Sequence, residues 1–485
     1  MNGKWFSWLV AACLTLAILP AWAFDPLLAE RSVPDTPAAG IVAGPQACQF
    51  GPLGSPLALP EAVARALCHN PKTRAAWAIV KAQAAAVGVA RAAFLPTVSG
   101  DWQGVRDSSR TDVNARPQLS SHTTATIRSE SLTLNWLLFD FGGRTAAVRN
   151  ASELLAVAQA TQDATLQDEF ATVAKDYDAA QAAQGALDVA REIERSVANS
   201  ATVAQARVDR GVAPISDALQ AQTQHELAVT DRIKAEGDLQ AAIGMLATDM
   251  GLDPSVPVAV PSVTATSLPG RDWDEPVAQL IDEVKHTHPT VRAAQAQFEA
   301  AQNKVTQTRA AGLPSVSLVA KYSRNNQPAS LGLGIPTFPA TGRDAYIGVQ
   351  VSIPIFEGFG RHYQIEQARA EAERLQDALD GAREQVALDV WTAWHALHTA
   401  ASSASQSETL LAIARRAFDA AQHRYRAGVG NILELLNTQA ALATAQQRRV
   451  QALADWHTAR LVLASRLGRL NVGSVEVGSS SIVER

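Results

Sequence analysis

Few residues in this 485-residue chain have the types and spacing that chemistry at a protein site requires. His395 and His398 share one face of an expected helix, but no third ligand falls at a matching spacing, so surface histidines are the better interpretation. His286 and His288 would not share a helix face. The serines lack a nucleophile-elbow context, and the glycines at 332–334 do not open a phosphate-binding helix. We therefore expect no enzyme activity, no cofactor and no metal.

Two acidic residues occupy equivalent places in a chain that repeats itself. Asp217 and Glu434 each follow a glycine-containing break between two expected helices, at Gly211 and at Gly428. An acid in the first turns of a helix is favoured by the helix dipole, which is the ordinary explanation. Basic and aromatic residues crowd the same breaks, where solvated charge is the ordinary explanation: Arg207, Arg210, Arg424, Tyr425 and Arg426.

The N-terminus has the pattern of a secretory signal. An apolar run over residues 5–19 is followed by small residues that place the cleavage after Ala23, so we expect 1–23 to be a signal peptide. The alternative is a lipoprotein cut before Cys13, although apolar residues continue beyond it. No later apolar run approaches the roughly 18 residues of a membrane helix. The protein is therefore expected to be exported and to enter a membrane only as strands.

Cleavage after Ala23 would leave two cysteines, Cys48 and Cys68. In an oxidising periplasm we expect them to pair, closing a loop of about 20 residues that is worth roughly 3 kcal/mol. Two separate buried thiols are the alternative.

Composition narrows the class of protein. Lys+Arg total 42 against 47 for Asp+Glu, a net charge of -5, and no basic face stands out, so we expect no nucleic-acid partner. Aromatic residues make up only 6% while alanine is abundant, which suits long, closely packed helices better than a large globular core.

A strand-like stretch that turns through glycine into a long alanine-rich run occurs twice. LTLNWLLFDFGGR (132–144) is echoed by VQVSIPIFEGFGR (349–361), and each copy begins with the period-two alternation of a half-buried strand. Further matches continue at an offset of about 217 positions, which indicates a duplicated unit.

The repeat sets the expected organisation of the chain. We predict an irregular tether (24–58), repeat 1 (59–250), a connector (251–276), repeat 2 (277–468) and a flexible tail (469–485). Repeat 1 is predicted to contain, in order, a helix (60–94), a β-hairpin (97–138), a long helix (143–209) and a second helix (215–250). The two strands of the hairpin are expected over 97–106 and 125–138, with a polar loop over 107–124 between them. Repeat 2 follows the same order, with its hairpin over 315–355.

Element lengths point to a membrane tube. An uninterrupted helix of 143–209 would be roughly 100 Å long, which no globular domain contains. Four strands of about 10–13 residues suit a tilted bilayer crossing, but four strands cannot close a barrel and an open edge is not tolerated in lipid. The strands must therefore be pooled between chains.

The duplicated strand–turn–helix unit, the Gly211 and Gly428 breaks followed by helices rich in Leu, Gln and Ala, and the export signal resemble the TolC family over residues 57–470. The resemblance implies an α+β membrane protein: a trimeric 12-stranded outer-membrane β-barrel, four strands per chain, continuing into a long periplasmic α-helical barrel built from two tandem repeats. It implies a channel that passively conducts protein toxins or small molecules for a tripartite type I secretion or efflux system. The implied partners are two further copies, outer-membrane lipid, a periplasmic adaptor and an inner-membrane ABC or RND transporter.

The resemblance also implies roles for the residues at the breaks. Glu434, and in the other repeat Asp217, would line the closed periplasmic constriction. The family's second acid three positions later is replaced by Asn437 and Gln220, which lowers the expected ring charge. The arginines, Tyr425 and the two glycines would hold the mouth shut and dock the adaptor. A periplasmic coiled-coil adaptor or structural protein is the alternative, and the alternating strands argue against it.

Overall fold

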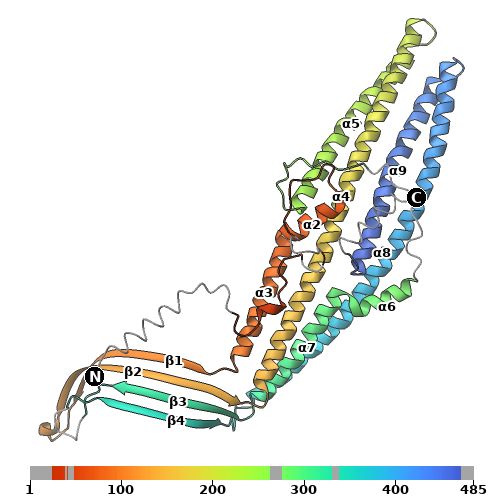
Figure 1. Cartoon of the computed structure of the whole chain (residues 1–485). Helices are drawn as coiled ribbons and strands as arrows, with labels where there is room; N and C mark the ends of the chain where they lie inside the picture. The colour runs from red at the N-terminus through yellow and green to blue at the C-terminus, as the bar shows by residue number, and fades with distance from the viewer. Residues whose placement is uncertain (1–24, 39–40, 42–47, 263–275, 330–337, 471–485) are drawn as a thin grey trace. The chain divides into compact units, whose positions relative to one another are not determined.

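The computed structural model describes residues 25–38, 41, 48–262, 276–329 and 338–470 (Figure 1). The expected signal peptide, the alternative cleavage site at Cys13 and residues 471–485 of the expected tail lie outside this part of the chain. The described residues fall into two compact units, one from 25–33, 81–155 and 299–373, the other from the rest. Helices α3 (Pro71–Ala92), α4 (Gly143–Asp209), α7 (Pro289–Ala310) and α8 (Gly360–Arg426) contribute residues to both units.

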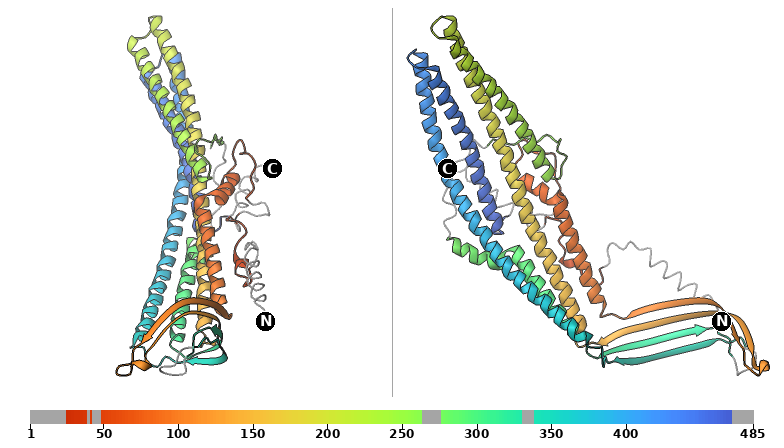
Figure 2. Two further views of the ribbon diagram at one scale, coloured as in Figure 1. Left: turned by 90° about the vertical axis from the view of Figure 1, so that its left-hand side faces the viewer. Right: turned by 180° about the vertical axis from the view of Figure 1, so that it is seen from behind.

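The first unit contains a four-stranded antiparallel sheet of order β1-β2-β3-β4. Its strands lie side by side in Figure 2 and span β1 (Thr97–Thr111), β2 (Ser121–Phe139), β3 (Ser315–Asn325) and β4 (Gly342–Ser352). Strands β1 and β4 are the edges, so each leaves one row of backbone groups without a partner strand in this chain.

The predicted loop over 107–124 was too long, because half of it, 107–111 and 121–124, continues the hairpin. β1 and β2 pair as far as Thr111 and Ser121, and only a short connection containing η2 (Pro117–Leu119) separates them. The alternation signal disappears in this region because polar residues stand on both faces, for example Ser108 opposite Thr124. Hydrophobic periodicity therefore cannot show that backbone pairing goes on.

The second hairpin is shorter than predicted. β4 ends at Ser352 rather than at residue 355, because Pro354 has no N–H to donate to a ladder. After each hairpin two consecutive residues adopt positive φ, Phe141 with Gly142 and Gly358 with Phe359. The order of aromatic residue and glycine is reversed between the repeats, although both turns lead directly into a long helix.

Helices make up the regular structure of the second unit (Figure 2). α4 and α8 each have 67 residues and are followed by α5 (Ile215–Asp249) and α9 (Ile432–Arg466), which return along them as antiparallel hairpins. α4 spans the residues predicted for it. No helix in the described part of the chain is both long and apolar enough to span a membrane.

The single helix predicted over 60–94 is two helices. α2 (Leu59–His69) and α3 are separated by Asn70, whose φ of -59° and ψ of 134° are extended. A proline disfavours helical backbone in the residue before it, and Pro71 therefore ends α2. The side chain of Asn70 then accepts a hydrogen bond from the Lys72 amide at 2.9 Å. Repeat 2 has the same break at His288, between α6 (Val277–Thr287) and α7.

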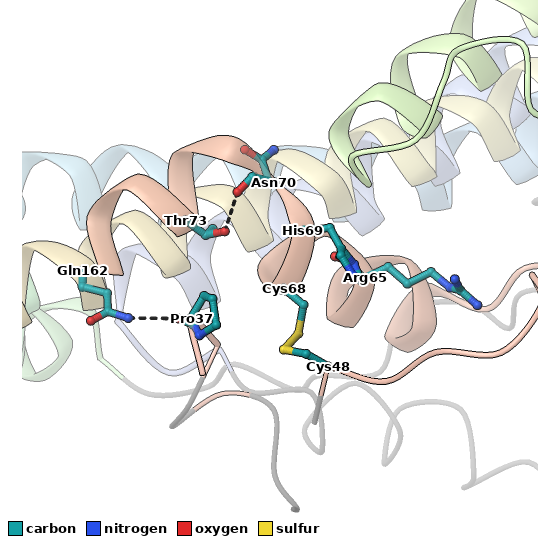
Figure 3. The surroundings of a disulfide bond; sticks show 8 residues. All are labelled: Pro37, Cys48, Arg65, Cys68, His69, Asn70, Thr73 and Gln162. Atoms are coloured by element: carbon teal, nitrogen blue, oxygen red, sulfur yellow. Dashed lines mark hydrogen bonds between the residues drawn. A yellow bond between two sulfur atoms is a disulfide. The ribbon is translucent and has the colours of Figure 1, made fainter. Parts of the chain in front are cut away.

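In its described residues, 25–38, 41 and 48–58, the segment predicted as a tether forms one short helix, η1 (Glu30–Ser32), and residues 48–58 are held in place by contacts with the rest of their unit. Leu57 is 1% exposed; its carbonyl accepts from the Tyr177 hydroxyl at 2.8 Å and its amide donates to Ala259 at 2.8 Å. The predicted disulfide is present: Cys48 and Cys68 are bonded, with Cα atoms 5.5 Å apart (Figure 3). This bond fastens the segment to α2, beside a core that includes Phe170 and Met250.

Candidate functional site at the helix hairpin tips

The first tip forms where α4 ends and the chain reverses through a left-handed glycine. Gly211 has φ of 72°, and the Val212 amide donates to the Arg207 carbonyl at 3.0 Å. This is the usual arrangement for a helix that stops at glycine, because a side chain at that backbone conformation would be strained. Pro214 then caps α5 without needing an N–H donor.

The second tip repeats this geometry with one further constraint. Gly428 has φ of 78°, and the amides of Val429 and Gly430 both donate to the Arg424 carbonyl. A Cβ on Gly430 would lie 2.7 Å from the Tyr425 amide nitrogen, so only glycine fits. The Asn431 side chain caps α9 by accepting from the Leu433 amide at 2.9 Å.

One arginine joins the two tips. Arg207 of α4 donates through Nη1 to the Tyr425 carbonyl of α8 at 2.6 Å, and its guanidinium carbon lies 4.8 Å from the centre of the Tyr425 ring. Tyr425 is only 2% exposed and packs in a cluster formed by both hairpins: Ala204, Ala221, Phe418, Ile432 and Leu435. The contact therefore combines a charge-assisted hydrogen bond with a cation–π interaction.

Charge around this tyrosine is uneven. Burial raises the pKa of Tyr425, the nearby Asp217 carboxylate acts in the same direction, and the Arg207 guanidinium opposes both. The Tyr425 hydroxyl and Arg207 Nε are buried without a hydrogen-bond partner among the described residues. Each of these two groups therefore lacks a hydrogen bond that it could form. Breaking the contact costs less free energy than breaking one in which every buried polar group is paired.

The two predicted acids lie in the first turns of their helices, as the repeat requires. Glu434 Oε1 is 3.5 Å from Arg424 Nη1, and both side chains are partly exposed. Asp217 is half-buried, within electrostatic reach of Tyr425. Arg210 and Arg426 are exposed at the tips. The predicted residues therefore gather at two neighbouring tips within one unit.

Sequence reasoning missed two contributors to this site. Gly430 follows Gly428 by two residues, and a Gly-x-Gly spacing before a helix cap was the available signal. The apolar cluster around Tyr425 had no sequence signal, because its members come from four different helices.

Histidine, cysteine and acidic side chains of the described residues were also candidates for a metal site. Within the described residues no three His, Cys, Asp or Glu side chains converge in a way that could hold a metal ion. The ring centres of His395 and His398 lie 4.9 and 3.9 Å from that of Trp394, the first ring edge-on to the tryptophan and the second tilted against it.

The chain thus combines a four-stranded sheet with open edges, two helices of 67 residues and paired hairpin tips. The family model described as "Outer membrane efflux protein" matches residues 62–252 and 280–469. The chain belongs to this family, which is the TolC family of outer-membrane channels, and the alternative of a periplasmic adaptor was wrong.

Individual relatives and solved structures agree. The chain is 34% identical over 420 residues to protein CyaE of Bordetella pertussis, covering 87% of this chain and 86% of that protein. It is 22% identical over 275 residues to outer membrane protein TolC of Escherichia coli, and the match covers 55% of this chain and 54% of that protein. The fold matches outer membrane protein VceC of Vibrio cholerae with a TM-score of 0.69 and 20% identity, covering 84% of this chain and 96% of that one. It matches CusC with a TM-score of 0.72 and 18% identity, covering 90% of this chain and 97% of that one.

Proposed function

We propose that this protein is the outer-membrane exit duct of a tripartite export system. Three copies pool their strands into a 12-stranded barrel, and their helices form a periplasmic tunnel. A periplasmic adaptor connects the tunnel to an inner-membrane ABC or RND transporter, which supplies the energy. The duct itself conducts passively, without a catalytic step or a cofactor.

The two chemically different faces of the sheet carry this proposal. Directly opposed residues share a face, and one face presents exposed apolar side chains on all four strands: Val98, Leu132, Trp136, Tyr322, Ile347, Val349 and Val351. The opposite face carries mainly serine, threonine, asparagine and glutamine. Such a sheet needs lipid on one side and water on the other, and its edges β1 and β4 need partner strands from other copies.

Names of relatives indicate the range of cargo. A protein 23% identical over 424 residues is called an alkaline protease secretion protein, and one 27% identical over 400 residues a pyoverdine export outer membrane protein. We infer that proteins or small molecules pass through this duct, and that the transporter rather than the duct selects between them.

We further propose that the tips form the gate. Glu434 and Asp217 face the constriction, while Arg207 and Tyr425 hold neighbouring hairpins together. The remaining tip residues (Arg210, Gly211, Arg424, Arg426 and Gly428) shape the tips and dock the adaptor. Support comes from the Arg207–Tyr425 contact, which joins residues 218 positions apart.

The assembly is tested first. Purified protein in mild detergent should give the mass of three chains by native mass spectrometry and should form channels in planar bilayers. A folded monomer that inserts into lipid would contradict the shared barrel.

The gate is tested on the same channels. Glu434→Gln should reduce cation preference and block by trivalent cations, because three converging carboxylates attract multivalent ions. Asp217→Asn should act in the same direction but less, and Glu226→Gln, an exposed acid further along α5, serves as the control. Equal selectivity and block in wild type and Glu434→Gln would remove the constriction role.

The contact between Arg207 and Tyr425 predicts a change in channel conductance. Tyr425→Ala and Arg207→Ala should each raise single-channel conductance, because the two hairpins lose the contact that joins them. Arg210→Ala, which changes an exposed charge at the same tip, should leave conductance unchanged. Unaltered conductance in both former variants would show that this contact does not hold the mouth closed.

A further inference from the structure

The apolar face of the sheet changes character along its length. Near the helices it carries rows of directly opposed apolar residues, such as Val98, Leu134, Ala320 and Ile347. Further from the helices the same face becomes basic, and the charged side chains that alternation places on it in the four described strands are Arg106, Arg110, His122, Arg128, Glu130, Arg324 and Arg343.

The arginines nearest to the apolar rows come one from each strand, at similar distances from its helix-side end: Arg106, Arg324 and Arg343 lie nine residues from that end, and Arg128 lies eleven, beyond the register shift between Leu137 and Phe139. Arg106, Arg128, Arg324 and Arg343 are each eight residues from an apolar residue on the same face: Val98, Trp136, Val316 and Val351. Eight residues of strand measure about 27 Å, and at the usual tilt this is roughly 20 Å of height. The four arginines, here called the arginine band, therefore stand near the limit of an apolar belt about 25 Å tall.

The band is continuous across the sheet. Arg324 lies directly opposite Arg343, whereas Arg128 is two residues beyond Glu130, the residue opposite Arg324. Arg106 is likewise diagonal to Arg128, which faces Gly104. Neighbouring Cα atoms in such positions are about 5 to 8 Å apart. The guanidinium groups can thus converge on ligands with several anionic oxygens.

The band has an excess of positive charge. All four arginines are exposed, and among the described residues none has a carboxylate within the 4.0 Å of an ion pair. Arg110, on the same face, is instead paired with Asp112 at 3.0 Å. Glu130 is the one acid on this face of the described strands, so four cations face one anion. Like charges placed opposite each other destabilise a sheet unless a counter-charge offsets them.

We propose that the arginine band binds the phosphate groups of lipids in the outward leaflet of the membrane, as an outer membrane provides in phosphorylated glycolipids. This inference rests on the proposed function, which turns the apolar face toward lipid and places the helices in the periplasm. The guanidinium fork matches phosphate oxygens bidentately. Trp102 and Tyr322, both exposed on the same face next to the band, suit a membrane interface.

The band faces lipid rather than the lumen. On the opposite face, the residues next to these arginines are uncharged except for Asp107 and Asp344, the neighbours of Arg106 and Arg343. A soluble anion passing through the duct would therefore meet neutral and acidic side chains at this height, whereas a lipid headgroup beside the barrel would meet the arginines.

The test compares two variants of the full-length protein. Arg106, Arg128, Arg324 and Arg343 are replaced together by Gln, and Arg110→Gln/Arg116→Gln serves as the control that removes hairpin arginines outside the band. Native mass spectrometry measures binding of a diphosphorylated lipid A and of the same glycolipid without phosphates. We expect the fourfold variant to bind the phosphorylated form at least about tenfold more weakly, with binding of the dephosphorylated form unchanged.

Several results would overturn the inference. Equal binding of phosphorylated and dephosphorylated glycolipid by the wild type would do so, as would undiminished binding by the fourfold variant or an equal loss in the control. Displacement by inorganic phosphate at concentrations that match the lipid would show a free-anion site instead. If the fourfold variant does not assemble, Arg324→Gln/Arg343→Gln replaces it under the same criteria.

Measurements of assembly and conductance distinguish a failure of the arginine band from a failure of the proposed function. Trimers that conduct normally, yet bind lipid independently of the arginines, would refute the band alone. A wild-type protein that neither forms trimers nor conducts would refute the duct, whatever it binds.

Discussion

The two strand-to-helix junctions share a motif but differ in its surroundings. Arg144 donates to Asp140 at 3.3 Å and to the carbonyls of Leu137 and Leu138 at 2.6 and 3.1 Å, and it lies over the Phe94 ring at 4.6 Å. Its side chain is 11% exposed. Among the described residues the equivalent Arg361 donates only to Glu357, at 2.9 and 3.0 Å, with 28% of its side chain exposed.

A single distant residue accounts for much of this difference. The position of Phe94 is taken in repeat 2 by Gly312, where a Cβ would already lie 3.2 Å from Arg361 Cγ. An aromatic ring covers the first arginine, and no ring covers the second. Duplicated residues thus keep their local conformation, while their burial depends on a neighbour more than forty positions away.

The long helices differ in the same way. α4 buries Asp178, 4% exposed, whose Oδ2 accepts one long hydrogen bond from Thr458 at 3.4 Å. Burial raises the pKa of Asp178 to about 7. The equivalent residue of α8 is the exposed His395. Repeat 1 therefore keeps an acid in its core where repeat 2 has a surface residue.

The largest expected effect tests the two junctions against each other. Arg144→Ala should destabilise the protein by about 3 kcal/mol, because it removes the guanidinium that pairs with Asp140 and donates to two carbonyls in a partly buried site, although the backbone amide of residue 144 still donates to Asp140. Arg361→Ala removes an exposed pair and should change stability little. Chemical denaturation of both variants in detergent measures the difference, and equal losses would show that burial of the arginine is irrelevant.

Asp178 should make the stability of this region depend on pH. The carboxyl has an ordinary pKa of 3.8 and a folded-state pKa of about 7, so the folded state holds the proton more tightly and stability falls as pH rises from about 4 to about 7. Asp178→Asn should then stabilise by on the order of 2 kcal/mol at pH 8 and have no effect near pH 4. Denaturation midpoints across this range report the effect. Asp419→Asn, an exposed acid on α8, is the control, and a parallel shift at every pH would contradict the linkage.

The smallest expected effect compares the two tips. Gly430→Ala should destabilise by about 1 kcal/mol, since the new Cβ would meet the Tyr425 amide nitrogen at 2.7 Å. The equivalent position of repeat 1 is already alanine, and Ala213→Gly should cost only the added freedom of the unfolded chain. The melting temperatures of the two variants measure these losses of stability. Identical values would mean that the second tip relaxes around the methyl group.

Much of the fold could be predicted from local signals. The ends of α4 coincide with the glycine turn at 142–143 and the break at Gly211, and the alternation over 132–138 marks the strand beside it. The break at Asn70 was missed although Pro71 signals it, because a strong helical pattern continues on both sides. The outer end of the first hairpin, 107–111 with 121–124, was missed because its two polar faces hide the strand period.

The site was predicted only in part. Gly211, Gly428 and the two acids are recognisable because each is tied to its own helix end. The Arg207–Tyr425 contact could not be predicted, since its partners are 218 positions apart and neither has a local reason to bind the other. The arginine band could not be predicted either, because one arginine from each strand forms a cluster only when the register of all four strands is known.

The sequence by itself determined the length of α4, the strand faces near the helices, the glycine reversals and the pairing of Cys48 with Cys68, since these depend on residues close together in the chain. Tertiary structure decided which copy of each duplicated residue is buried, which hairpins touch and which charges share a surface. Those properties depend on desolvation and on contact between segments that are distant in the chain, and two equivalent stretches acquire different energies when different neighbours cover them.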